Sequence, residues 1–261
     1  MDHTNNFALV LGGSKGLGFG TVRKLCSEGF PVIALHRDRK KDLPEIGQAF
    51  EAIRRSGGQL HAFQMDALNR DARQDFIREL PQILGSAKIF SVVYSIAKGN
   101  LKPLTAPGTD SGLGVADFRL TADAMAFAFY EWMEDLMRSG LLADDCRVIA
   151  FTSEGSRRVL PHYGAVGSAK ACLESLIRQM AVEWAPYGIR ANCLQAGVTD
   201  TESLRMIPGS DQILARSLKR NPGGRLTRPE DVANAAYLLC RPEAAWISGN
   251  VICVDGGESL C

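Results

Sequence analysis

The stretch FALVLGGSKGLG, residues 7–18, decides the fold. FALVL is a short apolar run that predicts a buried strand, and the glycine-rich turn after it leads directly into a helical pattern over 17–29. Glycine lets the backbone approach a phosphate closely where the free N–H groups of a helix N-terminus point at it. The glycines follow the spacing Gly-x3-Gly-x-Gly rather than the usual GxGxxG. We therefore predict a cofactor site at Gly12, Ser14, Lys15, Gly16, Leu17 and Gly18.

The same alternation of apolar runs and helical patterns continues along the chain. Further strands are predicted at 31–36, 60–67, 88–97, 146–153, 189–197 and 250–257. Helices are predicted up to Ser56, over 71–84 with an interruption at Pro81, and at 119–139, 161–186 and 229–240. Continuous apolar strands alternating with helices predict an α/β fold, a doubly wound parallel sheet with helices on both faces. The Gly- and Pro-rich stretch 98–114 is predicted as a loop, either a solvated connection or the lining of a site.

Composition narrows the class of protein. The chain has 261 residues, of which 46% are hydrophobic and 23% charged, with 30 basic against 29 acidic residues. This balance argues against a nucleic-acid or anionic-membrane partner. No stretch holds the ~18 apolar residues of a membrane span, and MDHTNNF lacks the apolar core of a secretory signal. Seven scattered cysteines without a CxxC pair fit no metal site, and we expect reduced thiols in a cytoplasmic protein.

The end of the second predicted strand bears on the choice of cofactor. NAD-binding sheets usually place an acid there for the ribose, whereas this chain has His36 and Arg37. The two cations Arg37 and Lys15 favour the 2′-phosphate of NADPH over NADH, while Asp38 argues for a ribose hydroxyl. Alternatively, HRDRKK is a solvated charge run. Asp66, after the third strand, is expected at the adenine edge or as a helix cap.

Five segments together carry a family resemblance. They are GGSKGLG, Asp66, the Tyr and Lys of YGAVGSAK (163–170), IRANCLQAG (189–197) and ISGNVICVDGG (247–257), with RLTRPEDVANAAYLL (225–239) in support. In this order they resemble the short-chain dehydrogenase/reductase family over essentially the whole chain. The resemblance implies one Rossmann-type domain over 1–261 with a sheet of about seven strands, and a homotetramer.

The spacing of Tyr163 and Lys170 points to one branch of that family. Its members commonly place the two residues four apart, but Val166 occupies that position here. A separation of seven is close to two helical turns, so both side chains are still expected on one face. Tyr-x6-Lys resembles the enoyl-acyl carrier protein reductases, in particular the type III branch, which also has a serine at the position of Ser153. The strand end with Ser95, Ile96 and Ala97 resembles the main enoyl reductase branch.

This resemblance implies NADPH-dependent reduction of the C2=C3 bond of a 2-enoyl thioester, with hydride going to C3. Tyr163 would then hydrogen-bond the forming enolate oxygen, Lys170 would hold the nicotinamide ribose, and Tyr163 or a water would protonate C2. Ser153 would either assist the oxygen or only order its loop. An acyl thioester, on acyl carrier protein or coenzyme A, is the expected substrate.

Further positions follow from the resemblance. Residues 199–218 would cover the acyl chain as a mobile segment, and Arg205, Lys219 and Arg220 would either meet an acidic carrier protein or be ordinary surface charges. Three departures stand out: Leu11 for a threonine, Asp123 where ketoreductases relay protons through an asparagine, and Ala196 for a proline. The remaining positions implied for the cofactor are Ala67, Ser95, Ile96, Ala97, Gly197, Val198 and Thr201.

Two alternatives remain open at this level. The chain could be a 3-oxoacyl thioester reductase or another carbonyl reductase, or a catalytically silent NADPH-binding regulator. A regulator would be expected to have lost Tyr163 or Lys170, and both are present.

Overall fold

A parallel sheet forms the centre of the computed structural model, which describes residues 6–105 and 112–261. In this part of the chain seven strands lie in the order β3-β2-β1-β4-β5-β6-β7, and each neighbouring pair is parallel. The strands are β1 (Asn6–Leu11), β2 (Val32–His36), β3 (Leu60–Gln64), β4 (Lys88–Tyr94), β5 (Leu142–Ser153), β6 (Ile189–Ala196) and β7 (Val251–Val254). This confirms the predicted Rossmann-type doubly wound sheet.

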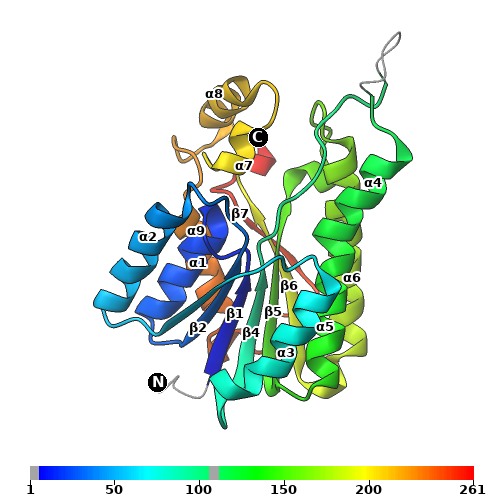
Figure 1. Cartoon of the computed structure of the whole chain (residues 1–261). Coiled ribbons are helices and arrows are strands. Elements are labelled where there is room, and N and C mark those ends of the chain that lie inside the picture. Colours follow the sequence, from blue (N-terminus) through cyan, green and yellow to red (C-terminus); the bar gives the residue numbers. More distant parts are fainter. Residues whose placement is uncertain (1–5, 106–111) are drawn as a thin grey trace.

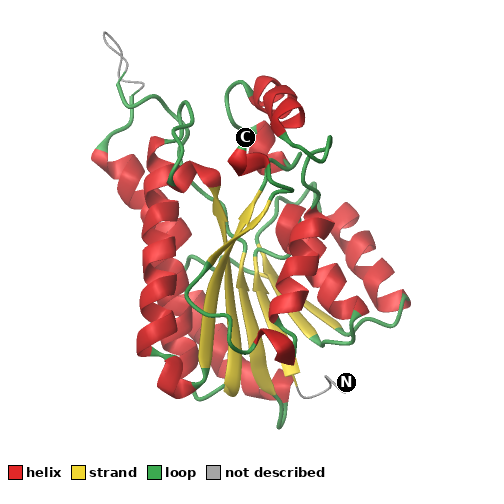
Figure 2. Ribbon diagram, turned by 180° about the vertical axis from the view of Figure 1, so that it is seen from behind, coloured by secondary structure: helices red, strands yellow, loops and turns green. Residues whose placement is uncertain are grey.

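Helices cover both faces of the sheet (Figures 1 and 2). One face packs against α3, α5 and α6, and the other against α1, α2 and α9. The helices are α1 (Gly16–Ser27), α2 (Leu43–Arg55), α3 (Arg70–Leu84), α4 (Val115–Ala122), α5 (Ala128–Arg138), α6 (Gly164–Glu183), α7 (Glu202–Arg205), α8 (Ser210–Arg220) and α9 (Pro229–Leu239). No helix within the described ranges is both long and apolar enough to cross a membrane.

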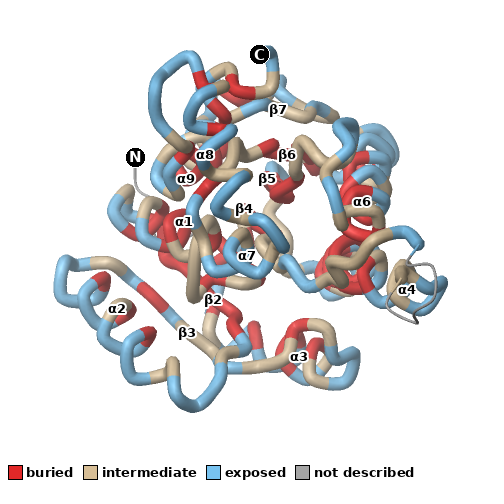
Figure 3. Tube along the Cα trace, turned by 90° about the horizontal axis from the view of Figure 1, so that it is seen from above, coloured by how far each residue is buried: buried red, intermediate tan, exposed pale blue. Residues whose placement is uncertain are grey.

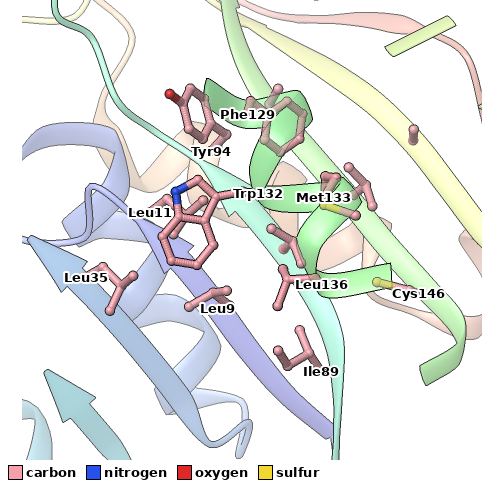
Figure 4. Packing of buried hydrophobic residues seen from close by; sticks show 14 of the residues in the cluster. Leu9, Leu11, Leu35, Ile89, Tyr94, Phe129, Trp132, Met133, Leu136 and Cys146 are labelled. Atoms are coloured by element: carbon pink, nitrogen blue, oxygen red, sulfur yellow. The ribbon is translucent and has the colours of Figure 1, made fainter. Parts of the chain in front are cut away.

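Trp132 lies at the centre of the larger core cluster. Its ring is fully buried between the sheet and α5, beside Leu9 and Leu136 (Figure 4). Its indole N–H donates to the Ala67 carbonyl oxygen at 2.8 Å, so the polar end of a large apolar side chain is satisfied. This bond ties α5 to the segment that follows β3, close to Asp66.

The helix predicted at 119–139 is interrupted by a π-helical turn, Asp123–Phe127, between α4 and α5. A π turn frees carbonyl groups that an α-helix would use. The hydroxyl of buried Tyr94, at the end of β4, donates to the Ala124 carbonyl oxygen inside this turn. The sequence pattern could not show this contact, because its partners are 30 residues apart.

Two further helix predictions differ from the structure. Pro81 does not interrupt its helix, since α3 runs through it to Leu84. Pro81 stands in the last turn, where its missing N–H removes a hydrogen bond only near the helix end. The helix predicted from residue 161 begins at Gly164, which makes Tyr163 its N-cap rather than a helical residue.

The strand order reverses beside β1. The chain runs outward from β1 to β3 and then crosses back to β4 on the other side of β1. In open α/β sheets, ligands bind outside the carboxyl ends of the strands at this reversal. Figure 3 looks down on this end of the molecule, where α7 and α8 lie over the strand ends.

Candidate active site

A pocket of about 370 Å³ lies at the carboxyl ends of the central strands. Leu101, Met125, Val166, Leu204, Met206, Ile207 and Ile213 give it a largely apolar wall. Ser153 and Tyr163, which both carry hydroxyl groups, are part of its lining, as is Gly197 after β6. The pocket thus offers an apolar chamber with hydroxyl donors on its wall, the usual form of a small-molecule site.

Tyr163 is held against the end of β5. Burial raises the pKa of its phenol above the ordinary value, and the nearby Ser153 hydroxyl acts in the opposite direction with a smaller effect. The phenol therefore stays protonated at neutral pH and can donate a hydrogen bond. The structure brings Ser153 and Tyr163 together, as the sequence analysis expected.

Gly155 makes room for the Tyr163 ring, and Gly167 makes room for the Gly155 backbone. A Cβ on Gly155 would lie 2.5 Å from two ring carbons, and a Cβ on Gly167 would lie 2.5 Å from the Gly155 carbonyl oxygen. His162, directly before Tyr163, has a φ of 63°, a conformation that costs a non-glycine residue about 1–2 kcal/mol. The sequence does not reveal these three residues, because only the folded loop shows which ring they position.

Lys170 is buried against β5. Its ammonium donates to the Phe151 carbonyl oxygen at 2.8 Å, two residues before Ser153 on β5. Burial lowers the pKa of Lys170 to about 8, while the nearby Cys193 and Glu174 side chains act to raise it. Lys170 therefore loses its positive charge as the pH rises through about 8, close to neutral pH.

The glycine turn fits a bound diphosphate. A Cβ on Gly18 would lie 2.0 Å from the Gly12 carbonyl oxygen and 2.9 Å from the Ser95 hydroxyl. Gly12 and Gly16 have φ values of 91° and 52°, which favour glycine. The first turn of α1 has no acidic residue, and no side chain caps its N-terminus. Its backbone N–H groups are thus placed as a phosphate would need them.

The charges expected to select NADPH are already paired. Lys15 lies 2.8 Å from Glu202 on α7, 3.1 Å from Asp42 and 3.9 Å from Asp38. Arg37 forms an ion pair with Asp66, which takes no part in the Lys15 contacts. These carboxylates offset the local positive charge that the sequence analysis relied on.

Asp66 and His36 have roles that sequence alone did not predict. Buried His36 pairs through Nδ1 with Asp38 at 2.8 Å. Asp66 accepts the Leu68 N–H at 3.0 Å, whereas Asn69 caps α3. The alternative of Asp66 as helix cap is therefore wrong.

The other expected cofactor residues fall at the same end of the sheet. Leu17, Ala97, Gly197, Val198 and Thr201 line the pocket. Ser95 touches the glycine turn, Ile96 packs against the core, Ala67 is buried, and Ser14 is partly buried in the turn. A Cβ added to Gly16 would lie 3.3 Å from the Thr201 side chain, so the segment after β6 contacts the glycine turn.

The C-terminal turn takes part in the pocket, which the sequence analysis did not foresee. Glu258, 1% exposed, accepts the Val198 N–H at 3.1 Å and a bond from Arg220 at 3.0 Å. Arg220 also donates to Glu154 at 2.7 Å, directly after Ser153. This cluster joins α8 to the loops around the site through residues far apart in sequence.

The segment 199–218 forms α7 and most of α8, and its residues make one wall of the pocket. Arg205 is paired with Asp200 and Asp211, and Arg220 with two glutamates, so neither is a free surface charge. Asp123 is exposed and Met125 lines the pocket instead, so the Asp123 side chain is not placed for a proton relay there.

Comparison with known proteins shows the family to which the chain belongs. Residues 12–259 match the family described as Enoyl-(Acyl carrier protein) reductase. A tropinone reductase homologue of Arabidopsis thaliana is 30% identical over 97% of this chain and 93% of its own length. A probable 2,4-dienoyl-CoA reductase of Bacillus subtilis is 28% identical over 97% and 96% of the two chains. The enoyl-[acyl-carrier-protein] reductase (NADH) of Aquifex aeolicus, 24% identical over 98% and 97%, shares the fold with a TM-score of 0.83.

The chain belongs to the short-chain dehydrogenase/reductase family and resembles its enoyl-acyl carrier protein reductases. It is an NAD(P)H-dependent oxidoreductase of this kind.

Proposed function

We propose that this chain reduces the C2=C3 double bond of a 2-enoyl thioester with NADPH. One observation carries the proposal: Tyr163 reaches the apolar pocket from seven residues before Lys170, while Val166, four before it, is a buried apolar part of the same wall. A carbonyl must receive hydride and proton at adjacent atoms. An enoyl thioester receives hydride at C3 while charge develops on the thioester oxygen, two carbons away, so its oxygen partner must lie farther from the hydride.

Tyr163, Ser153 and Lys170 have different roles in the proposed reaction. When bound, reduced nicotinamide supplies the hydride. The protonated Tyr163 phenol donates a hydrogen bond to the thioester oxygen as that oxygen gains charge, and Ser153 orients the phenol. The ammonium of Lys170 favours negative charge nearby and would hold the cofactor ribose. The apolar wall excludes water and receives the acyl chain. C2 is then protonated by Tyr163 or a water.

NADPH is the proposed reductant because Lys15 and Arg37 flank the expected ribose position. A 2′-phosphate would have to exchange with the carboxylates that now pair with these cations. The remaining cofactor residues proposed are those of the glycine turn and of the strand ends after β3, β4 and β6.

A carbonyl reductase is the second candidate, and one observation favours it. Several relatives at 26–30% identity are tropinone reductase homologues, whereas others are named as acyl-CoA reductases, among them 1-cyclohexenylcarbonyl-CoA reductase of Streptomyces collinus. We favour the enoyl substrate because Val166 has no group to donate to a carbonyl oxygen.

A thioester panel separates these candidates. Enoyl- and 3-oxoacyl-thioesters, on acyl carrier protein and on coenzyme A, would each be assayed with NADPH and with NADH. We expect the fastest turnover with an enoyl thioester and NADPH. Turnover of 3-oxoacyl thioesters alone would establish the carbonyl reductase, and faster turnover with NADH would overturn the cofactor proposal.

The proposed setting is a cytoplasmic homotetramer acting in fatty acid or related lipid synthesis, with acyl carrier protein as the carrier. Arg216 on α8 lines the pocket and, within the described ranges, has no ion-pair partner. Its guanidinium is therefore available to a negatively charged group of the carrier. Size-exclusion chromatography with light scattering would test the tetramer.

A further inference from the structure

The last three residues of β5, Phe151 to Ser153, each interact with one polar side chain from α6 or from its N-cap. The Phe151 carbonyl accepts from Lys170 at 2.8 Å, and the Ser153 hydroxyl acts on the Tyr163 phenol and lowers its pKa. Between them, the Thr152 hydroxyl donates to the carboxylate of Glu174 at 2.7 Å. Two of these three contacts belong to the site already described, whereas Glu174 has no part in it.

Glu174 occupies a place where an apolar residue would serve the fold. Val148 and Ala150 are fully buried on the α6 side of β5, and Thr152 continues their row at the pocket end. Glu174 is 4% exposed, and it also lies 3.7 Å from Arg157, a side chain that is itself 66% exposed. Burying a carboxylate costs free energy that an apolar residue at this position would not cost. Its cost indicates a role beyond packing.

Glu174 follows Lys170 by one turn of α6, so the two side chains lie on one helix face toward β5. Cys193 also lies near Lys170, and burial raises the pKa of the Cys193 thiol to about 12. This thiol is therefore neutral at working pH. Arg157 lies 3.7 Å from Glu174, and Arg178 acts on Cys193; both are positive. Glu174 is an acidic side chain whose charge raises the pKa of the buried Lys170 ammonium.

We propose that Glu174 is a positioning residue that keeps Lys170 in its ammonium form and, through Thr152, fixes the strand end that presents Ser153 to Tyr163. The catalytic part of this proposal rests on the proposed function of Lys170, but the charge effect does not. Because Lys170 has a pKa of about 8, a moderate loss of negative charge beside it is enough to deprotonate it at neutral pH.

The test measures Lys170 directly. The enzyme would be labelled with ¹³C-lysine and titrated by NMR without substrate, with Lys170→Arg assigning the resonance. Glu174→Gln keeps the shape and an acceptor for Thr152 but removes the charge, so we expect the pKa of Lys170 to fall by about one unit, about tenfold in its deprotonation equilibrium. An unchanged pKa in Glu174→Gln would overturn the proposal.

Three variants complete the design. Glu183→Gln, at the exposed end of the same helix, is the matched control and should leave the pKa unchanged. Glu174→Asp keeps the charge and should largely retain the wild-type value, which keeps the proposal testable if Glu174→Gln folds poorly; a full shift in Glu174→Asp would contradict it. Thr152→Val should lower turnover at every pH with little change in the Lys170 pKa.

Activity then gives a second measurement. In wild type, kcat/KM should fall as pH rises through about 8, since the ammonium is lost there, and in Glu174→Gln this fall should move to lower pH. If no thioester is turned over, the proposed function fails, while the NMR titration still decides the role of Glu174.

Discussion

Replacing Gly155 by alanine would displace Tyr163 without touching either of its chemical groups. The added Cβ would lie 2.5 Å from ring carbons Cδ1 and Cε1, whereas ordinary contacts begin near 3.4 Å. The backbone of Gly155 does not have the positive φ that would make alanine strained in itself. The ring must therefore move by about 1 Å, a displacement that typically costs about 100-fold in rate. We expect kcat/KM to fall about 100-fold, or about 2.7 kcal/mol of transition-state stabilisation.

The assay is reduction of an enoyl thioester under kcat/KM conditions, together with cofactor binding measured by nicotinamide fluorescence. Cofactor affinity should be unchanged, since Gly155 does not line the glycine turn. Gly47→Ala is the matched control, because a Cβ on this α2 glycine meets nothing within 4 Å. That variant should keep full activity and gain about 1 kcal/mol of stability from its better helix propensity.

A double-mutant cycle makes the test specific. If Gly155→Ala acts by moving the phenol, it should cost little more once Tyr163→Phe has removed the hydroxyl. A Gly155→Ala enzyme with wild-type kcat/KM, or one whose loss simply adds to that of Tyr163→Phe, would refute the placement of Tyr163 described above.

Three further predictions follow from the same contacts. Tyr163→Phe should lower kcat about 100- to 1,000-fold with cofactor affinity intact, because one donor to the developing oxyanion is lost; equal turnover in steady-state assays would contradict this. Lys15→Gln should weaken NADPH binding about tenfold and NADH binding less, by fluorescence titration, because the charge that would meet the 2′-phosphate is removed. Trp132→Ala should lower the free energy of unfolding by about 3–5 kcal/mol in urea titrations, since a fully buried ring and its bond to Ala67 are lost, and a change below about 1 kcal/mol would argue against the core packing described.

The sequence predicted the sheet well because its strands are continuous apolar runs between helical patterns. It also predicted that Ser153 and Tyr163 belong to one site, and both residues line the pocket. Lys170 was expected on one helix face with Tyr163, but Tyr163 is the N-cap of that helix, and Lys170 is buried against the Phe151 carbonyl oxygen. What it could not predict are contacts between distant segments. Lys15 was expected to be free for a phosphate, yet it pairs with Glu202, 187 residues away. Glu258 and the π turn beside Tyr94 depend in the same way on tertiary contacts that leave no periodic signal.

Glu174 illustrates the same limit. In the sequence it is one acidic residue in a helical pattern, and helix α6 carries another at Glu183. Only the fold shows that one is buried against Thr152 while the other is exposed.

The most direct test of the central claim compares two substrates that differ only in the reacting group. Purified enzyme with NADPH would be given a 2-enoyl thioester or the 3-oxoacyl thioester of equal chain length on the same carrier, and cofactor oxidation would be followed by absorbance. A kcat/KM for the enoyl thioester well above that for the 3-oxoacyl thioester, lost in Tyr163→Phe, is the predicted result. A preference for the 3-oxoacyl thioester, or enoyl turnover that survives Tyr163→Phe, would contradict it.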